Sequence, residues 1–316
     1  MRAGFDCATK LSLQSAKALK QAGFTYAARY LGESWKTFDE KEAAAIQSAG
    51  LLLISIFQKS ANRSSYFSWK QGELDGKEAS NYAKEVDQPK GTAIYFAVDF
   101  DAQLKDMETI RRYMNGVKNQ LQDYKVGVYG SSRVMQALKE QVDYYWQTYA
   151  WSRGEVCDFI HMYQYENNVY AAGINVDRNE IKKAPGDWGE LRSTEAVKPQ
   201  KIPKYDVVKN INAYRNAQDA LANKNSKGTV KPDSYYIFNE SEGMVNVTKQ
   251  QNMPGSWINP KENRNQSKEE QYHIVKNKET LTYIAKKYHT TVAKLQALNN
   301  IDNPNLIYVN QKIKYK

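Results

Sequence analysis

Short apolar runs alternate with amphipathic stretches along the first 182 residues. The apolar runs are typical of strands that are buried on both faces of a parallel sheet. They predict eight strands, at residues 2–7, 26–31, 51–57, 92–101, 125–129, 146–151, 159–164 and 174–177. The stretches between them predict helices at residues 12–22, 38–48, 72–85, 106–121 and 132–140. This alternation predicts an α/β fold, a (β/α)₈ TIM-like barrel that is partly degenerate because its last connections are too short for helices.

Carboxylates end several of the predicted strands. Asp99 and Asp101 end the fourth strand. Because residues two apart on a strand point to the same side, these two side chains are expected to share a face. Asp6 ends the first strand and Asp177 ends the eighth. Right-handed crossovers bring strand ends to one face of a barrel, so all four acids are expected to lie together. The alternative is that these residues cap helices or form ion pairs with nearby arginines.

Aromatic and amide residues fall at or near the ends of other strands, namely Tyr129, Trp151 and Gln164. Four acids with aromatic rings and an amide around them are typical of a site that cleaves sugars. One carboxyl must be protonated to donate to the leaving oxygen, and another must be ionised to stabilise the oxocarbenium-like centre. Close packing of acids raises the pKa of at least one of them, which supplies this difference. The barrel is therefore predicted to be a glycoside hydrolase.

The same segments carry a resemblance to a known family. They are residues 4–6, 29–31, 94–101, 128–130, 149–151, 163–165 and 176–177. They resemble the glycoside-hydrolase-like domains of the DUF1906 group, which are relatives of the glycoside hydrolase family 25 lysozymes. The resemblance covers about residues 2–182. It implies an acid-lined barrel that acts on amino-sugar polymers, and it implies no metal or organic cofactor.

Roles for the acids follow from this resemblance. Asp101 stands where the lysozymes have the Glu that is the general acid, and its side chain is one methylene shorter. Asp99 is implied to orient or stabilise the intermediate. Asp6 and Asp177 are implied to set the electrostatic field of the site and to hold water. The implied sugar contacts in the barrel are Arg29, Tyr129, Trp151 and Gln164.

The last part of the chain, residues 271–316, shows a strand, two helices and a closing strand. The segments are 272–275, 280–288, 291–298 and 311–315. They resemble a LysM domain, with Lys278 and Glu279 in place of the usual Gly-Asp and Asn310 in place of a Gly. Asparagine is the residue that best replaces glycine at a positive φ, so Asn310 is expected to be tolerated. LysM domains bind N-acetylglucosamine-containing glycans, and the resemblance implies contacts from Asn277, Lys278, Glu279, Thr280, Asn303, Pro304, Leu306 and Ile307.

A region of short alternating segments lies between these two domains. Residues 206–260 predict short strands separated by polar turns, as in a small β-barrel, and are similar to SH3-like wall-binding modules. The alternative is a structural spacer. Residues 195–205 and 261–270 have little apolar periodicity and predict linkers. The predicted domains are therefore 1–194, 206–260 and 271–316.

The net charge of +10 is concentrated in the second part of the chain. Residues 1–196 hold 25 Lys and Arg and 25 Asp and Glu, whereas residues 197–316 hold 20 and 10. This excess favours a polyanionic partner such as an anionic wall polymer, or it serves solubility alone. The sequence shows no nucleic-acid motif and no apolar run long enough for membrane insertion. Two cysteines and three scattered histidines predict neither a disulfide framework nor a metal site.

An acid-lined barrel followed by a glycan-binding domain predicts a peptidoglycan hydrolase. The expected activity is that of an N-acetylmuramidase, which cleaves the β-1,4 strand of N-acetylglucosamine and N-acetylmuramic acid. The N-terminus shows no apolar secretory segment. The whole therefore resembles a phage endolysin, made in the host cytoplasm and released to the cell wall through a separate membrane pore. The alternative is a non-catalytic wall-binding protein whose barrel holds glycan without cutting it.

Overall fold

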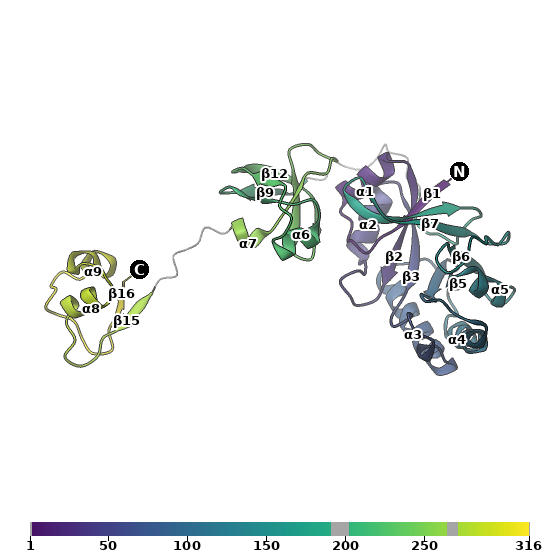
Figure 1. The fold of residues 1–316 in the computed structure, drawn as a ribbon, viewed down its shortest axis with the longest axis horizontal. Coiled ribbons are helices and arrows are strands. Elements are labelled where there is room, and N and C mark those ends of the chain that lie inside the picture. The colour runs from purple at the N-terminus through teal and green to yellow at the C-terminus, as the bar shows by residue number, and fades with distance from the viewer. Residues whose placement is uncertain (1, 191–201, 264–270, 316) are drawn as a thin grey trace. The chain divides into compact units, whose positions relative to one another are not determined.

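The computed structural model describes residues 2–190, 202–263 and 271–315 (Figure 1). The chain forms two compact units, Met1–Pro260 and Lys261–Lys316. The first unit contains a barrel and a smaller β-module, and the second contains two helices beside a two-stranded sheet. No helix among the described residues is both long enough and apolar enough to cross a membrane.

Eight strands close into a barrel in chain order, which confirms the predicted architecture. They are β1 (Arg2–Asp6), β2 (Phe24–Leu31), β3 (Leu52–Phe57), β4 (Ala93–Ala97), β5 (Lys125–Gly130), β6 (Tyr144–Thr148), β7 (Met162–Ala171) and β8 (Ile174–Ile181). Strands β1 to β7 pair in parallel, but β8 runs antiparallel to both β7 and β1. The expectation that every strand would end at the same face is therefore wrong for β8. The turn between β7 and β8 is too short for a crossover, so the two strands form a hairpin.

Five α-helices follow the first five strands and cover the outside of the barrel (Figure 1). They are α1 (Leu13–Gln21), α2 (Glu40–Ser48), α3 (Trp69–Glu85), α4 (Met107–Gln120) and α5 (Ser132–Ala137), with 3₁₀ turns η1 (Ser64–Tyr66) and η2 (Leu104–Asp106). Ser12 caps α1 with a capping box, and Asp39 caps α2 by accepting from the Glu42 backbone N–H. The helices α3 and α4 touch through glycines, because a Cβ at Gly72 would lie 2.0 Å from the Tyr113 carbonyl oxygen.

The core of the barrel has an inner and an outer apolar layer. Along β2, Tyr26 and Ala28 belong to the inner layer, whereas Ala27 and Leu31 belong to the outer layer under the helices. Successive strand residues alternate in this way, so Arg29 is directed to the outer layer with Ala27 and Leu31. This alternation decides which side chains of β2 can reach the mouth of the barrel.

The fourth strand is shorter than the predicted 92–101, since β4 ends at Ala97. Asp99 and Asp101 therefore lie in the loop that follows, and the prediction that they share one face of a strand is wrong. Phe100, between them, packs on Phe67 with ring centroids 5.7 Å apart. The two carboxylates are consequently held by different neighbours.

The β-module has one four-stranded and one two-stranded sheet. The strands are β9 (Lys204–Val207), β12 (Asp233–Ser241), β13 (Met244–Thr248) and β14 (Ser256–Ile258) in the first sheet, and β10 (Ile211–Ala213) and β11 (Gly228–Val230) in the second. The sequence did not predict helix α6 (Ala217–Ala222), and β9 includes Lys204 and Tyr205, which were assigned to the linker 195–205. The rest of that linker, up to residue 201, lies outside the described residues. The likeness of the β-module to SH3-like modules stays a prediction.

The second unit has the strand, helix, helix, strand order that the sequence predicts. Its elements are β15 (Tyr272–Ile274), α8 (Leu281–Lys287), α9 (Val292–Asn299) and β16 (Lys312–Lys314), and the short helix α7 (Pro260–Asn263) precedes them at the boundary between the units. Asn310 has a φ of 69°, so an asparagine does occupy the left-handed position expected of it. Lys278 has a φ of 67°. Helix α7 includes the first residues of the predicted linker 261–270, and residues 264–270 lie outside the described parts.

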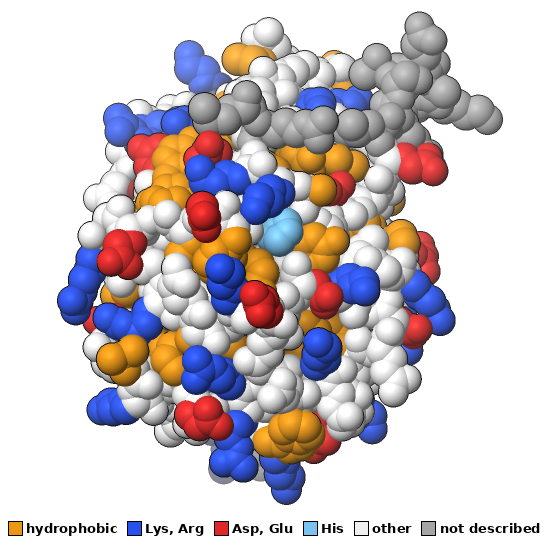
Figure 2. Space-filling model, turned by 90° about the vertical axis from the view of Figure 1, so that its right-hand side faces the viewer, with side chains coloured by type: hydrophobic (Ala, Val, Ile, Leu, Met, Phe, Trp, Pro, Cys, Tyr) orange, Lys and Arg blue, Asp and Glu red, His pale blue; other side chains and the backbone are white. Residues whose placement is uncertain are grey.

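Charged side chains of both signs are interspersed on the face shown in Figure 2, and neither sign forms a large continuous area there. Residues 1–196 accordingly hold equal numbers of basic and acidic residues. This face offers no broad basic surface of the kind that binds nucleic acid.

Candidate active site

Asp6, the last residue of β1, is the centre of the candidate site. Its side chain is buried, with 4% of the residue exposed. The side-chain amides of Gln164 and Asn179 both donate to Oδ2, at 2.9 and 2.8 Å. Oδ1 receives no hydrogen bond from the described residues. Burial and the charge of Asp177 raise the pKa of Asp6 to about 7, although the two amides lower it.

The two amides are oriented by donors on their opposite ends. Trp146 Nε1 donates to Asn179 Oδ1 at 2.7 Å, and the Tyr129 hydroxyl donates to Gln164 Oε1 at 2.8 Å. Thr148 Oγ1 also donates to Gln164 Oε1, at 3.0 Å. Because each amide oxygen is an acceptor in these bonds, each amide nitrogen must point at Asp6. Gln164 therefore positions Asp6, and Asn179, which the sequence analysis missed, does the same.

Asp177 and Asp99 lie close enough to Asp6 to raise its pKa. Asp177, on β8, is the direct antiparallel partner of Asp6, and its Oδ1 accepts from the Asn168 backbone N–H at 2.8 Å. Burial and the Asp99 charge raise the pKa of Asp177. Asp99 Oδ2 accepts from Gln58 Nε2 at 2.8 Å. The site thus combines a carboxyl that is protonated near neutral pH with ionisable neighbours.

Asp101 lies apart from this cluster of Asp6, Asp99 and Asp177. Its side chain is half exposed and faces Arg133, with 3.6 Å between Oδ1 and the guanidinium. The charge of Asp101 is not among the causes that shift the pKa of either Asp6 or Asp177. The prediction that all four acids lie together is therefore wrong for Asp101, because the loop after β4 turns it toward α5.

Arg29 does not reach the site. Its guanidinium is fully buried, and Nε donates to Glu42 Oε1 on α2 at 2.7 Å. The predicted sugar contact of Arg29 is consequently wrong, since the side chain points to the outer layer of the barrel. Its neighbour Tyr30 lines the cavity beside Asp6 instead, and strand alternation was the signal in the sequence that could have found it.

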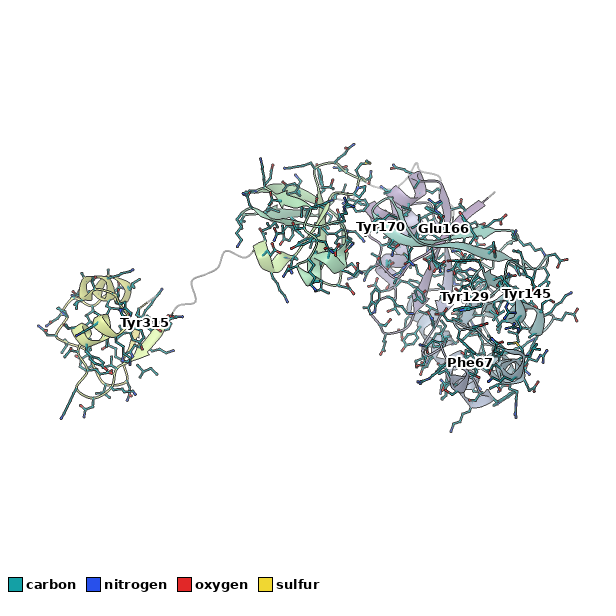
Figure 3. All side chains as sticks on the ribbon, viewed as in Figure 1. Phe67, Tyr129, Tyr145, Glu166, Tyr170 and Tyr315 are labelled. Carbon is teal, nitrogen blue, oxygen red and sulfur yellow. The ribbon has the colours of Figure 1, made fainter. Side chains whose placement is uncertain are left out.

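Tyr129 and Trp151, the two predicted aromatic contacts, differ in position. Tyr129 lies within the barrel, half-buried, with its ring 5.1 Å from that of Trp146 (Figure 3). Burial raises the pKa of its hydroxyl, so it stays a neutral donor. Trp151 follows β6 with a φ of 57° and is 36% exposed. It does not line the cavity beside Asp6, and its contact with a sugar stays a prediction.

A cavity of about 390 Å³ opens beside Asp6 and Asp177. Three aromatic residues from the barrel, Tyr30, Trp35 and Tyr170, also line it. Its volume lies in the range of small-molecule sites, which is about 300–1,000 Å³. Aromatic rings beside carboxylates can stack on a sugar ring while the acids contact its hydroxyl groups. The described residues contain no group of three or more His, Cys, Asp or Glu that could hold a metal ion.

A comparison with known families matches residues 17–181 to the Rv2525c-like, glycoside hydrolase-like domain, which is more than half of the chain. The chain belongs to this family. Its Rv2525c-like barrel is similar to two Bacillus subtilis (strain 168) proteins, Uncharacterized protein YbfG and Uncharacterized protein FadG. Each is 33% identical, over 147 and 142 residues. Both matches cover 41% of this chain, but only 20% of YbfG and 24% of FadG.

Among solved structures, the Rv2525c-like barrel is similar to the Tat-secreted protein Rv2525c of Mycobacterium tuberculosis, crystallised in complex with L-tartrate. The TM-score is 0.53 and the identity 22%, over 60% of this chain and 99% of that protein. At this identity the likeness supports the fold and no more. Residues 273–316 match the LysM domain, which confirms the resemblance of the second unit.

Two of the predicted LysM contacts, Glu279 and Thr280, make hydrogen bonds within the domain. Glu279 is largely buried, and its Oε2 accepts from His273 Nε2 at 2.6 Å and from the Lys276 backbone N–H at 2.8 Å. Thr280 caps α8 through a hydrogen bond from the Tyr283 backbone N–H. Asn277, Lys278, Thr280, Asn303 and Leu306 are exposed, while Pro304 and Ile307 are half-buried. The glycan contacts themselves stay a prediction.

Proposed function

We propose that this chain binds bacterial peptidoglycan and hydrolyses its β-1,4 glycan strand by carboxylate acid/base catalysis, with the LysM domain as anchor. The observation that carries the proposal is Asp6, a buried carboxyl with a pKa of about 7 beside two further aspartates. Membership of a glycoside hydrolase-like family and the LysM match support the same chemistry. Anchoring raises the effective substrate concentration at the barrel, so a weak active site suffices.

Asp6 is the general acid in this proposal. Two amides already donate to its Oδ2, so the carboxyl proton belongs on Oδ1, the oxygen that has no protein partner. Oδ1 donates that proton to the glycosidic oxygen as the bond to the sugar carbon breaks. The negative charge of Asp99 or Asp177 stabilises the oxocarbenium-like centre, water then adds to it, and the proton that the water loses returns to Asp6 Oδ1. This replaces the role that the family resemblance implied for Asp101.

The bond after N-acetylmuramic acid is the proposed point of cleavage, which makes the protein an N-acetylmuramidase. The proposal places its action at the bacterial cell wall, with release of the phage endolysin type from the host cytoplasm. Anionic wall polymers are a further proposed partner, supported by the basic excess of residues 197–316.

The test is to incubate the full chain with purified peptidoglycan and to identify new ends by borohydride reduction and mass spectrometry. Wild type should release reduced muramic acid ends, and Asp6→Asn and Asp99→Asn should release far fewer. Asp101→Asn is the matched control, because it removes a nearby carboxylate outside the cluster. Reduced glucosamine ends would retain the acid mechanism but change the bond. Ends that persist unchanged in Asp6→Asn would refute Asp6 as the acid.

A non-catalytic glycan-binding protein is the second candidate, and the position of Asp101 favours it. The residue that aligns with the lysozyme general acid is half exposed and paired with Arg133. In that case wild type would pellet with peptidoglycan and release no new ends of any kind. The carboxylates of the cluster would then serve recognition of the glycan.

A further inference from the structure

The β-module, residues 204–259, packs directly on the barrel within the first unit. Ser12 at the start of α1 donates two hydrogen bonds to this module: its backbone N–H donates to Asn239 Oδ1 at 3.0 Å and its hydroxyl donates to the Phe238 carbonyl. Gln14 donates to the Ile237 carbonyl and accepts from the Asn252 backbone N–H. The Phe238 ring is fully buried within the outer core layer of the barrel. These contacts hold the module in a defined place beside the start of α1.

The turn between β7 and β8 is packed against the same module. A Cβ built on Gly173 would lie 2.5 Å from Pro254 Cβ, so only glycine fits there without a shift. Tyr170, near the end of β7 (Figure 3), interacts with Asn216 of the module through a side-chain hydrogen bond. The hairpin that carries Asp177 is therefore in contact with the module at two points.

The cavity beside Asp6 has its second wall in this module. Asn216, Ala217, Gln218, Asp219 and Trp257 line it opposite the barrel residues. Asn216 and Asp219 are engaged with each other, because Asn216 Nδ2 donates to Asp219 Oδ2 at 2.9 Å. Gln218 is exposed, and its amide makes no hydrogen bond to the described residues. It is thus a free donor and acceptor on the wall that faces Asp6.

The lining of the cavity has one sign of charge. Asp6, Asp177 and Asp219 contribute carboxyl groups, and neither Lys nor Arg is among the described residues that line it. An anionic ligand such as a phosphate polymer or an oligomer of uronic acids would meet repulsion there. The aromatic rings of Tyr30, Trp35 and Tyr170 offer flat apolar surface to a ring that carries hydroxyl and amide groups.

We propose that the β-module is part of the substrate site and forms, through Gln218, a subsite for a neutral N-acetylated hexose. The inference rests on the proposed function for the identity of the polymer. It assigns the module to the binding of the same glycan that the barrel acts on, and not to a passive spacer.

Tryptophan fluorescence of the full chain gives a test that the LysM domain does not disturb. All six tryptophans lie in residues 1–260, and Trp35 and Trp257 line the cavity. A fluorescence change on titration with tri-N-acetylchitotriose should therefore report binding to the first unit, and the variants below locate that binding at the cavity. Gln218→Ala should weaken this binding about three- to tenfold, the effect of one net hydrogen bond. Gln218→Phe, which fills the subsite, should abolish the response.

The matched control is Gln122→Phe, at an exposed glutamine just before β5 that does not line the cavity. It should bind the trisaccharide as wild type does. An acidic trisaccharide, trigalacturonate, should bind wild type at least tenfold more weakly. Equal binding of the acidic probe would overturn the charge argument. Absence of any response in wild type, or unchanged binding by Gln218→Phe, would overturn the subsite.

A second pair of variants tests the docking of the module. Gly173→Ala places a methyl group against Pro254 and should displace the module, so trisaccharide binding should fall at least tenfold. Gly243→Ala is its control, since Gly243 has a similar φ of +74° but nothing within 4 Å of a built Cβ. Equal loss of binding in both variants would assign the effect to backbone strain, and wild-type binding by Gly173→Ala would show that this contact does not hold a module that is part of the site.

Failure of this inference and failure of the proposed function are distinguishable. Binding of the trisaccharide that depends on Gln218, without release of new peptidoglycan ends, would retain the subsite and reject the hydrolase. Release of muramic acid ends at the wild-type rate by Gln218→Phe would retain the hydrolase and reject the subsite.

Discussion

Asp6 and Asp177 lie directly opposite each other in the antiparallel pair of β1 and β8. Side chains of opposed residues stand on the same face of a sheet, about 4.5–5.5 Å apart at Cβ, and two negative charges there destabilise each other. This relationship follows from the reversed direction of β8. It contributes to the raised pKa of Asp6, after burial.

Replacement of Asp177 by Asn should lower the pKa of Asp6, because it removes a charge that disfavours the carboxylate form. If Asp6 is the acid, the alkaline limb of kcat/KM against pH should move to lower pH than in wild type. The profile is measured with soluble peptidoglycan fragments between pH 4 and pH 9. A limb that stays in place would show that the acid is another residue.

Replacement of Asp6 by Asn should reduce glycan hydrolysis by roughly 10²- to 10⁴-fold, the usual contribution of a general acid. Asparagine keeps the size of the side chain, and its oxygen can still accept from Gln164 and Asn179. Retained binding of tri-N-acetylchitotriose is the control that separates loss of chemistry from loss of the site. Activity within tenfold of wild type would contradict the role.

Although Asp6→Asn should reduce activity, it should increase the stability of the protein at neutral and alkaline pH. The pKa of Asp6 rises from 3.8 to about 7 on folding, so its neutral form is favoured in the folded state. The contribution of Asp6 to the free energy of unfolding is therefore greatest below pH 4. It declines as the pH rises toward 7, because Asp6 ionises at lower pH in the unfolded chain than in the folded protein. Each pKa unit corresponds to about 1.4 kcal/mol, so Asp6→Asn should be more stable than wild type at pH 8 by on the order of 2–4 kcal/mol. Urea unfolding at pH 4 and pH 8 measures this, and equal pH dependence of both proteins would argue against it.

Arg29 and Glu42 should matter for folding and not for substrate. Their side chains are fully buried, and loss of one partner leaves an unpaired charge. Arg29→Met should therefore lower the free energy of unfolding by about 3–5 kcal/mol, and the double variant Arg29→Met, Glu42→Leu should recover much of it. At a temperature where each variant is folded, kcat/KM should be close to the wild-type value. A specific rise in KM in Arg29→Met would restore the substrate contact predicted from the sequence.

Glu279 should stabilise the LysM domain and should not contact the glycan directly. The hydrogen bond from His273 lowers the pKa of Glu279, so its contribution is present above the usual carboxyl range and is lost as the pH falls through the lowered pKa. Glu279→Ala should reduce hydrogen-exchange protection in β15 and α8, whereas Lys278→Ala, at an exposed neighbour, should not. Lost binding to insoluble chitin with unchanged protection would instead make Glu279 a direct contact.

The sequence by itself determined most elements of the barrel and of the LysM domain, and the chemistry they bring. The barrel strands follow from apolar runs, and the LysM helices from Thr280 and Thr291, whose side chains cap them as local chemistry requires. Asp6 could be named because an acid at the end of a buried strand is costly without a function, and Asp177 because it ends the predicted strand 174–177, although β8 continues to Ile181. The positive φ of Asn310 was also predictable, because it depends only on this residue and its turn.

Only the tertiary structure decided how these residues meet. The hairpin of β7 and β8 reverses the last strand and sets Asp177 against Asp6, and the early end of β4 leaves Asp101 beside Arg133. Asn179 and Tyr30 join the site from β8 and β2, Gln58 joins it from the residue after β3, and Gln218 lines its cavity from the β-module. Periodicity reports the environment of one segment, whereas burial, charge coupling and cavities depend on distances across the closed barrel and across its contact with the β-module.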